Sequence, residues 1–348
     1  MDEERGRLQP PAEAVRLEQP IGRGIRGFLA FLVCGAVLVA VFAVGWLWLG
    51  ARKGAGGTVA GTDSTAEDSA SGSAPETSGE AVTEPLPADA IPIRSADLSG
   101  SVELLNETSY TPDPAALRAL IGGEPRSFSP EQPVVLILHT HAQEAYLAQP
   151  ADYLTGPLGD AIYTLDPDRS VIAAGEALCR ELTRNGVPAI HCTDLHGEGG
   201  TLRGAYRSAA DCIAAYLEQY PSIAYVIDLH RDGIVASDGA CLRTETPGNG
   251  TAQIQMVVGS DGNGTECPAW RSNLGLALCL RDRLNAEIPA SCRPVVLRNA
   301  SYNQEIAPHS LLLEIGSSGN TVSEAIAAAE RAGRLLAALI CNRPADGA

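Results

Sequence analysis

After residue 130 the chain alternates short apolar segments with longer amphipathic ones, and this alternation restricts its fold more than any other feature. The segment 170–185, for example, has apolar residues one helical turn apart and ends before Gly186. Strands separated by helices need crossover connections, which produce parallel strands with helices on both faces. We therefore expect an α/β fold: a three-layer α/β/α domain with a largely parallel central sheet. The segments that we expect to be strands are 134–138, 187–191, 224–229, 252–258, 295–298 and 310–315, and the expected helices are 170–185, 202–219, 270–287 and 323–340.

Residues that can bind a metal or carry a proton stand at the ends of three of these strand segments. His141 and Glu144 follow the first, His230 closes another, and Glu314 lies near the end of a third. The carboxyl ends of strands in an open α/β sheet are where ligands bind, so these side chains can converge there. If the chain turns into a helix after the first strand, His141 and Glu144 share one helical face. Two imidazoles and a carboxylate are typical zinc ligands, and Glu314 could take a proton from an activated water. The pattern predicts a zinc hydrolase site with metal ligands His141, Glu144 and His230.

Other residues compete for these roles. His139 lies two residues before His141, so on an extended backbone both would face the same side and could ligate together. We prefer His141 because of its spacing to Glu144. His191 and His196 flank a glycine-rich turn, where contact with substrate and simple solvation are both compatible with the pattern.

Arg231 is the second catalytic candidate, beside Glu314. It is adjacent to His230 and could hold a substrate carboxylate or an oxyanion, whereas the alternative is a salt bridge with Asp228 or Asp232. Either of those two carboxylates could instead orient the second ring nitrogen of His230.

The residues 28–50 form an uncharged apolar run. A helix of this length spans about 30 Å, the thickness of the hydrocarbon core, at about 1.5 Å per residue. A cleaved signal peptide is the alternative, but its apolar region is usually shorter. Basic residues are slightly more numerous before the run than after it, which favours a cytoplasmic segment 1–27 and an extracytoplasmic remainder. We expect a single-pass anchor in the cell membrane.

The segment 51–95 that follows is rich in small residues and acids, which predicts a disordered linker. The remaining parts are a pre-catalytic segment, 96–129, and a catalytic domain, 130–343. The formal net charge of −17 argues against nucleic acid as a partner, because that binding needs a basic surface.

The sequence contains nine cysteines. Cys34 falls in the expected membrane span and the others lie outside it, where disulfides are permitted but their pairing cannot be read from the spacing. There is no Cys-x-x-Cys, which argues against a cysteine zinc cluster or a thioredoxin-like redox pair. Cys179, Cys212 and Cys279 occupy apolar helix positions, which is typical of buried thiols.

Several blocks together resemble the stage II sporulation protein P family, a family of membrane-anchored peptidoglycan hydrolases of endospore formers. The resemblance covers about residues 130–342. The blocks are LILHTHAQEAY at 136–146, IDLHRD at 227–232, MVVG at 256–259, YNQE at 302–305, LLEIG at 312–316 and the pair Asn320 and Thr321.

The resemblance implies an amidase, phosphorylase/hydrolase-like fold and zinc-dependent N-acetylmuramoyl-L-alanine amidase activity, with cleavage of peptide cross-links also attributed to the family. It implies His141, Glu144 and His230 as metal ligands and Glu314 as the catalytic carboxylate. It also implies location at the sporulation septum during engulfment, with stage II sporulation proteins D and M as partners.

Two departures from the family pattern concern substrate contacts more than the metal site: Gly197 stands where the family has an acid, and the cysteines are unusually many. Zinc carboxypeptidases share a similar arrangement of ligands, so a carboxypeptidase-type or cross-link endopeptidase is one alternative. A tethered, non-catalytic wall-binding module is another.

Overall fold

A computed structural model describes residues 87, 90–155, 162–197 and 203–344. The chain divides into two units, Met1–Glu80 and Ala81–Ala348, and all the described residues belong to the second. The expected cytoplasmic segment 1–27, the membrane span 28–50 and most of the linker 51–95 lie outside the described residues. Within the described part of the chain, no helix has both the length and the apolar character that a membrane crossing requires.

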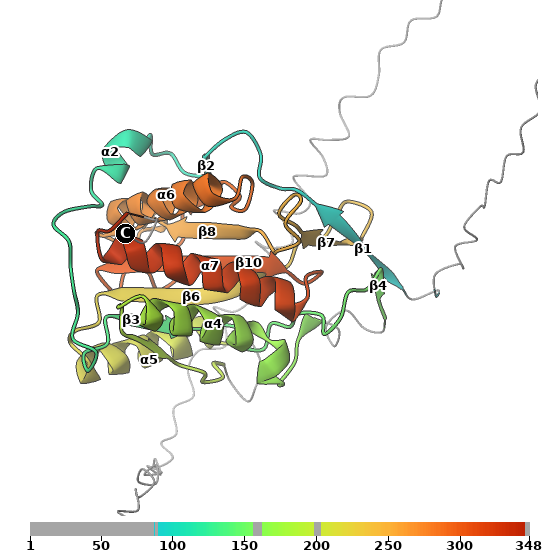
Figure 1. Cartoon of the computed structure of the whole chain (residues 1–348), viewed down its shortest axis with the longest axis horizontal. Helices are drawn as coiled ribbons and strands as arrows, with labels where there is room; N and C mark the ends of the chain where they lie inside the picture. Colours follow the sequence, from blue (N-terminus) through green and yellow to red (C-terminus); the bar gives the residue numbers. More distant parts are fainter. Residues whose placement is uncertain (1–86, 88–89, 156–161, 198–202, 345–348) are drawn as a thin grey trace, which may run out of the picture. The chain divides into compact units, whose positions relative to one another are not determined.

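The centre of the second unit is a seven-stranded mixed sheet in the order β2-β9-β8-β10-β6-β3-β5 (Figure 1). Its strands are β2 (Leu104–Asn106), β3 (Val135–Leu138), β5 (Ala189–His191), β6 (Tyr225–Asp232), β8 (Ile254–Gly259), β9 (Val295–Arg298) and β10 (His309–Ser317). Neighbouring strands are parallel except β8 and β10, which are antiparallel.

The expected largely parallel sheet is therefore corrected to a mixed one. A parallel connection needs a crossover, usually a helix. Between β6 and β8 the chain forms the strand β7 (Cys241–Thr244) and no helix among the described residues, and β8 then enters the sheet in the opposite direction.

Helices cover both faces of this sheet. They are α4 (Val171–Arg184), α5 (Ala205–Gln219), α6 (Trp270–Glu287) and α7 (Val322–Ile340). Figure 1 shows α4, α6 and α7 across one face, where α7 packs against both of the others. On that face Ile227 and Leu313 join the larger core, whereas Val226 and Leu138 point to the opposite face and pack with Ile213 of α5. Alternation along these strands thus directs successive side chains to opposite faces of the sheet.

The segments before β3 belong to the same unit. The strand β1 (Ile91–Ala96) pairs with β4 (Tyr153–Leu154) and β7 in a small second sheet. Residues 91–95 are therefore part of a strand, which corrects the end of the expected linker.

The expected pre-catalytic segment, 96–129, is likewise part of the domain. It contributes β2 to the main sheet, and its short helix α2 (Pro114–Arg118) packs on α6. The absence of a side chain at Gly275 allows this packing, since a Cβ there would lie 2.4 Å from the carbonyl oxygen of Leu117. Two single 3-10 turns, η2 (Pro167–Arg169) and η4 (Asp261–Asn263), complete the elements.

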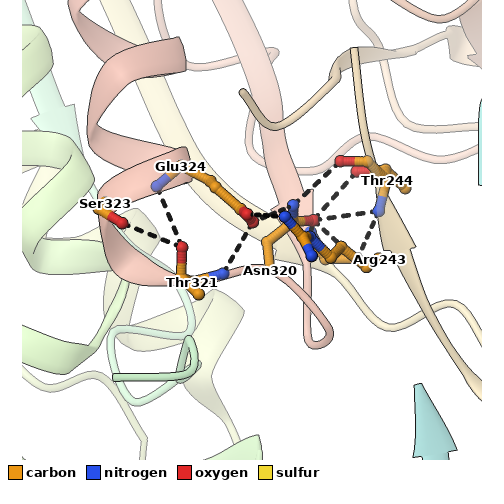
Figure 2. A network of polar contacts seen from close by, with 7 residues as sticks. Arg243, Thr244, Asn320, Thr321, Ser323 and Glu324 are labelled. Carbon is orange, nitrogen blue, oxygen red and sulfur yellow. Dashed lines mark hydrogen bonds and ion pairs between the residues drawn. The ribbon is translucent and has the colours of Figure 1, made fainter. Parts of the chain in front are cut away.

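A polar network fixes the start of α7 beside β7 (Figure 2). Thr321 is the N-cap, and its hydroxyl and the Glu324 carboxylate form a reciprocal capping box. Asn320 accepts hydrogen bonds from the backbone and the hydroxyl of Thr244 and donates to the Thr244 carbonyl and to Glu324. Arg243 forms an ion pair with the same Glu324 carboxylate. Of the two residues that the family pattern singles out, Asn320 therefore links the end of β10 to β7, and Thr321 caps α7.

Candidate metal centre and active site

The register between β6 and β10 places two of the sequence-predicted residues side by side. Glu314 is the direct Cα partner of His230 across parallel strands, so both side chains point to the same face. This is the face that α5 covers, because Val226 and Leu138 on the same side pack with that helix.

Three side chains converge next to this pair. One carboxylate oxygen of Glu144 lies 3.5 Å from Nδ1 of His141, and the other lies 3.4 Å from Nδ1 of His230. One ligand atom from each of the three residues lies within 4.8 Å of the other two. Ligands about 2.0–2.2 Å from a tetrahedral zinc ion are roughly 3.5 Å apart, so this group of donors fits that ion. The structure thus brings together the three residues that we expected to bind the metal.

The backbone reaches this arrangement by a route that the sequence did not indicate. A helix after β3 was the condition under which we expected His141 and Glu144 to share a face, but the chain forms a tight turn in which the Glu144 N–H donates to the His141 carbonyl at 3.0 Å. A turn closed by this hydrogen bond brings residues i and i+3 together as one turn of helix would, so the two side chains are close without a helix.

His139 lies outside this group. The turn ends the extended backbone directly after β3, so His139 and His141 do not share a side. Nδ1 of His139 contacts the Leu229 carbonyl at 2.8 Å, and its Nε2 lies 2.8 Å from Nε2 of His191, beneath Gly175 of α4. Burial and the neighbouring His191 lower the pKa of His139 to about 3. It is a neutral core residue in this structure.

Asp228 supports the group from behind. Its carboxylate accepts hydrogen bonds from the backbone and the hydroxyl of Thr140, at 2.8 and 2.6 Å, and lies 3.0 Å from Nε2 of His230. Burial alone would lower the pKa of His230, but the carboxylates of Asp228 and Glu144 outweigh burial and raise it. Asp228 and Asp232 were the two candidates for orienting His230. Asp228 faces the ring, whereas Asp232 pairs with Arg293.

Glu144 is held by the backbone of β6. The N–H of Arg231 donates to its carboxylate at 2.9 Å. Burial alone would raise the pKa of Glu144, but the charge of His230 and hydrogen bonds from both histidines outweigh burial and lower it. The carboxylate is therefore ionised and ready to bind a cation.

The guanidinium of Arg231 donates hydrogen bonds to backbone carbonyls and forms no salt bridge with Asp228 or Asp232 in the described structure. Its Nε donates to Ala145 at 3.1 Å and its Nη2 to Ile162 at 2.6 Å. The side chain is buried and holds the segment after Glu144 against the loop before α4. In this conformation Arg231 acts on the position of Glu144.

Glu314 has the properties of a proton acceptor. Its Oε2 is buried and has no hydrogen-bond partner in the described part of the chain. Burial raises the pKa of the Glu314 carboxyl to about 8, against the lowering effect of His230. A carboxyl group with a free oxygen and a pKa near neutrality can both take and return a proton.

The structure adds residues that sequence reasoning missed. The ring of Tyr206, on α5, packs edge-on against His141 with centroids 5.5 Å apart, and Tyr302 lies 6.2 Å beyond it. Tyr302 and Asn303 both have positive φ, at 54° and 57°, and Asn303 donates to the Tyr206 carbonyl. Strained backbone of this kind often occurs at functional sites. The YNQE block was the only signal for these residues, and nothing in the sequence pointed to Tyr206.

Comparisons with known proteins agree with the sequence blocks. The family model of stage II sporulation protein P matches residues 62–340. Stage II sporulation protein P of Bacillus subtilis (strain 168) is 26% identical over 224 residues, which are 60% of this chain and 51% of that protein. The chain thus spans about half the length of this curated relative.

Solved structures give weaker similarities. The apo N-acetylmuramyl-L-alanine amidase Ami1 from Mycobacterium abscessus is 14% identical, with a TM-score of 0.36, over 60% of this chain and 97% of that one. The CwlD amidase from Clostridioides difficile, solved in complex with the GerS lipoprotein, is 18% identical, with a TM-score of 0.33, over 57% and 95%. These scores are too low to add to what the site itself indicates.

Proposed function

The chain belongs to the stage II sporulation protein P family, and from this premise we propose that it is a zinc peptidoglycan hydrolase. The specific reaction that we propose is hydrolysis of the amide between N-acetylmuramic acid and L-alanine. The observation that carries the proposal is the group of His141, Glu144 and His230 with Glu314 beside it on the same sheet face.

The chemistry of the donors supports a metal here. His141, Glu144 and His230 would hold Zn²⁺, which when bound polarises a carbonyl and makes a water molecule more acidic. Asp228 keeps the ring of His230 in place, and the Arg231 N–H does the same for Glu144. Such supporting contacts orient the ligands and strengthen the site.

Glu314 supplies the proton transfers. Its free carboxylate oxygen can accept the proton of the attacking water and then return it to the amide nitrogen, so that the peptide leaves as a neutral amine. Burial favours both transfers, because a raised pKa lets the same group act first as base and then as acid.

The test is the product set released from purified sacculi by the full-length chain. An amidase releases stem peptides with a free L-alanine amino group and leaves muramic acid on the glycan, which mass spectrometry identifies. A cross-link endopeptidase or a carboxypeptidase would instead cut within the stem peptides.

Two variants accompany that test. Glu314→Gln should lower product release by several orders of magnitude while zinc stays bound at the histidines. Glu330→Gln is the matched control, since this glutamate lies on α7 and pairs with Arg180 at the surface. If Glu314→Gln releases as much peptide as the control, or if the unmodified chain only adheres to sacculi, the proposed hydrolase is refuted.

We further propose that residues 28–50 anchor the chain in the cell membrane, with the catalytic unit extracytoplasmic. The uncharged run and the distribution of basic residues support this. By the family resemblance, stage II sporulation proteins D and M would be its partners during engulfment. Co-purification of the full-length chain with each of them from sporulating cells tests that pairing.

A further inference from the structure

A second group of potential metal ligands lies near α5, apart from the site described above. Cys192 follows β5 directly, His196 lies in the loop after it, and Cys212 lies on α5. One ligand atom from each of these residues lies within 4.8 Å of the other two, and the two sulfur atoms are 3.4 Å apart. Two elements and the loop between them thus meet at one point.

His196 is the observation that indicates a ligand. Its side chain is only 6% exposed, yet Nε2 has no hydrogen-bond partner in the described residues. The other ring nitrogen, Nδ1, lies 3.3 Å from the hydroxyl of Ser208 on α5. A buried imidazole with one nitrogen oriented by a hydroxyl and the other unpaired is the usual state of a histidine that binds a metal.

We propose that Cys192, His196 and Cys212 bind a second Zn²⁺ ion, which has a structural role. Two thiolates and an imidazole are ligands that zinc prefers, and ligands at about 2.3 Å from a tetrahedral ion place two sulfur atoms roughly 3.7 Å apart. A disulfide would require about 2.05 Å. The observed separation is closer to that of two ligands around an ion.

The two cysteines already contact each other. Their sulfur atoms share one hydrogen bond, of which either can be the donor. Metal binding would replace the shared proton between the two sulfur atoms.

The second ion would act on the first site through α5. Tyr206 lies in the first turn of α5 and packs on the ring of His141, while Ser208 and Cys212 lie further along the same helix. An ion that links the loop after β5 to α5 would hold the helix in the position where Tyr206 contacts His141. The expectation against a cysteine zinc cluster rested on the absence of Cys-x-x-Cys, but here the ligands come from separate elements.

Cobalt substitution distinguishes the two sites. Co²⁺ bound by thiolate gives a sulfur-to-metal charge-transfer band in the near ultraviolet, and the site at His141, Glu144 and His230 contains no sulfur. The full-length chain, purified with a mild reductant and loaded with Co²⁺, should show this band and bind about two metal ions. Cys212→Ser should abolish the band and leave about one ion, whereas His230→Ala should keep the band.

Cys279→Ser is the control, because this half-buried thiol on α6 packs against the core, contacts the Arg118 carbonyl and lies outside both metal-ligand groups, so the band should be unchanged. A missing band in the folded unmodified chain would refute the second site. So would a mass that rises by two hydrogens when the purified chain is fully reduced, with the change mapped to Cys192 and Cys212, since that would identify a disulfide. Neither result depends on hydrolysis, so the second site and the proposed function can fail separately.

Discussion

At the scale of single residues, Asp228 connects two parts of the candidate site. It binds both polar hydrogens of Thr140, which precedes the turn with His141, and it faces His230 from β6. One buried carboxylate therefore contacts the segments that carry two proposed metal ligands, which are far apart in the sequence. Its charge also makes the imidazole of His230 a better donor.

Asp228→Asn therefore tests whether Asp228 positions the proposed metal ligands, and not whether it takes part in the reaction. The amide keeps the shape but removes the charge, so we expect the zinc affinity of the His141, Glu144 and His230 site to fall by about 10–100-fold. Competition with a chromophoric chelator measures that affinity, in a Cys212→Ser background so that only one site is counted. Asp211→Asn, an exposed change on α5, should leave it unaltered. Equal affinities in the two variants would contradict the role of Asp228.

The placement of His139 makes a second prediction. A Cβ on Gly175 would lie 2.6 Å from ring atoms of both His139 and His191. Because His139 is fixed by the Leu229 carbonyl, Gly175→Ala should destabilise the fold by about 1–3 kcal/mol, measured by urea unfolding. Adding His191→Ala should recover part of the loss, since it removes one of the two contacts. If His139 were instead free to turn toward a metal, the glycine substitution would cost little.

Sequence reasoning selected the candidate residues because each follows, or lies near the end of, an expected strand. In the structure β6 and β10 extend past His230 and Glu314, and the register of the two strands determines that these residues meet. Sequence reasoning preferred His141 to His139 on its spacing to Glu144 alone, because the point where the extended backbone stops, which separates the two histidines, cannot be read from the sequence. Tyr206 was missed for a similar reason: it belongs to the first turn of a helix whose contact with His141 is a tertiary one.

At the scale of elements, the segments with a clear apolar pattern were predicted well and those without one were not. The expected helix 270–287 and strand 295–298 are α6 and β9 with the same bounds. The strands β1, β2 and β7 contain few buried residues and pair with partners distant in the sequence, so local pattern contains little information about them.

The start of α7 offers a graded prediction for one element (Figure 2). Thr321→Ala removes the N-cap and should lower the free energy of unfolding by about 1 kcal/mol. Asn320→Ala should cost about 1–3 kcal/mol, because it leaves buried groups of Thr244 without partners. Ser323→Ala is the control, since within the described residues its hydroxyl makes one hydrogen bond, to the hydroxyl of Thr321, and it should change stability by less than about 0.5 kcal/mol. Urea unfolding that ranks the three differently would contradict this account.

At the scale of the whole molecule, the two sheets have different roles. The strands β3, β6 and β10 carry the candidate metal site, while the small sheet of β4, β1 and β7 lies beyond β10 and holds the start of α7 through Thr244 and Asn320. The antiparallel β8 follows β7 directly. The second sheet is therefore a support for the final helix and contributes no ligand to the site.

A pair of truncations tests this separation. A chain that begins at Ala81 keeps β1 and should unfold cooperatively, because every described element lies in that unit. A chain that begins at Asp97 loses the pairing of Ile91–Ala96 with β7, and we expect it to be less stable by a few kcal/mol, at about 1 kcal/mol for each ladder hydrogen bond lost. Zinc affinity at His141, Glu144 and His230 should be the same in both chains, because the pairing partners of β1 are β4 and β7, which carry none of these residues. If the shorter chain instead loses zinc while its far-ultraviolet spectrum stays native, the small sheet supports the site as well as the helix, and the division of labour proposed for the two sheets is wrong.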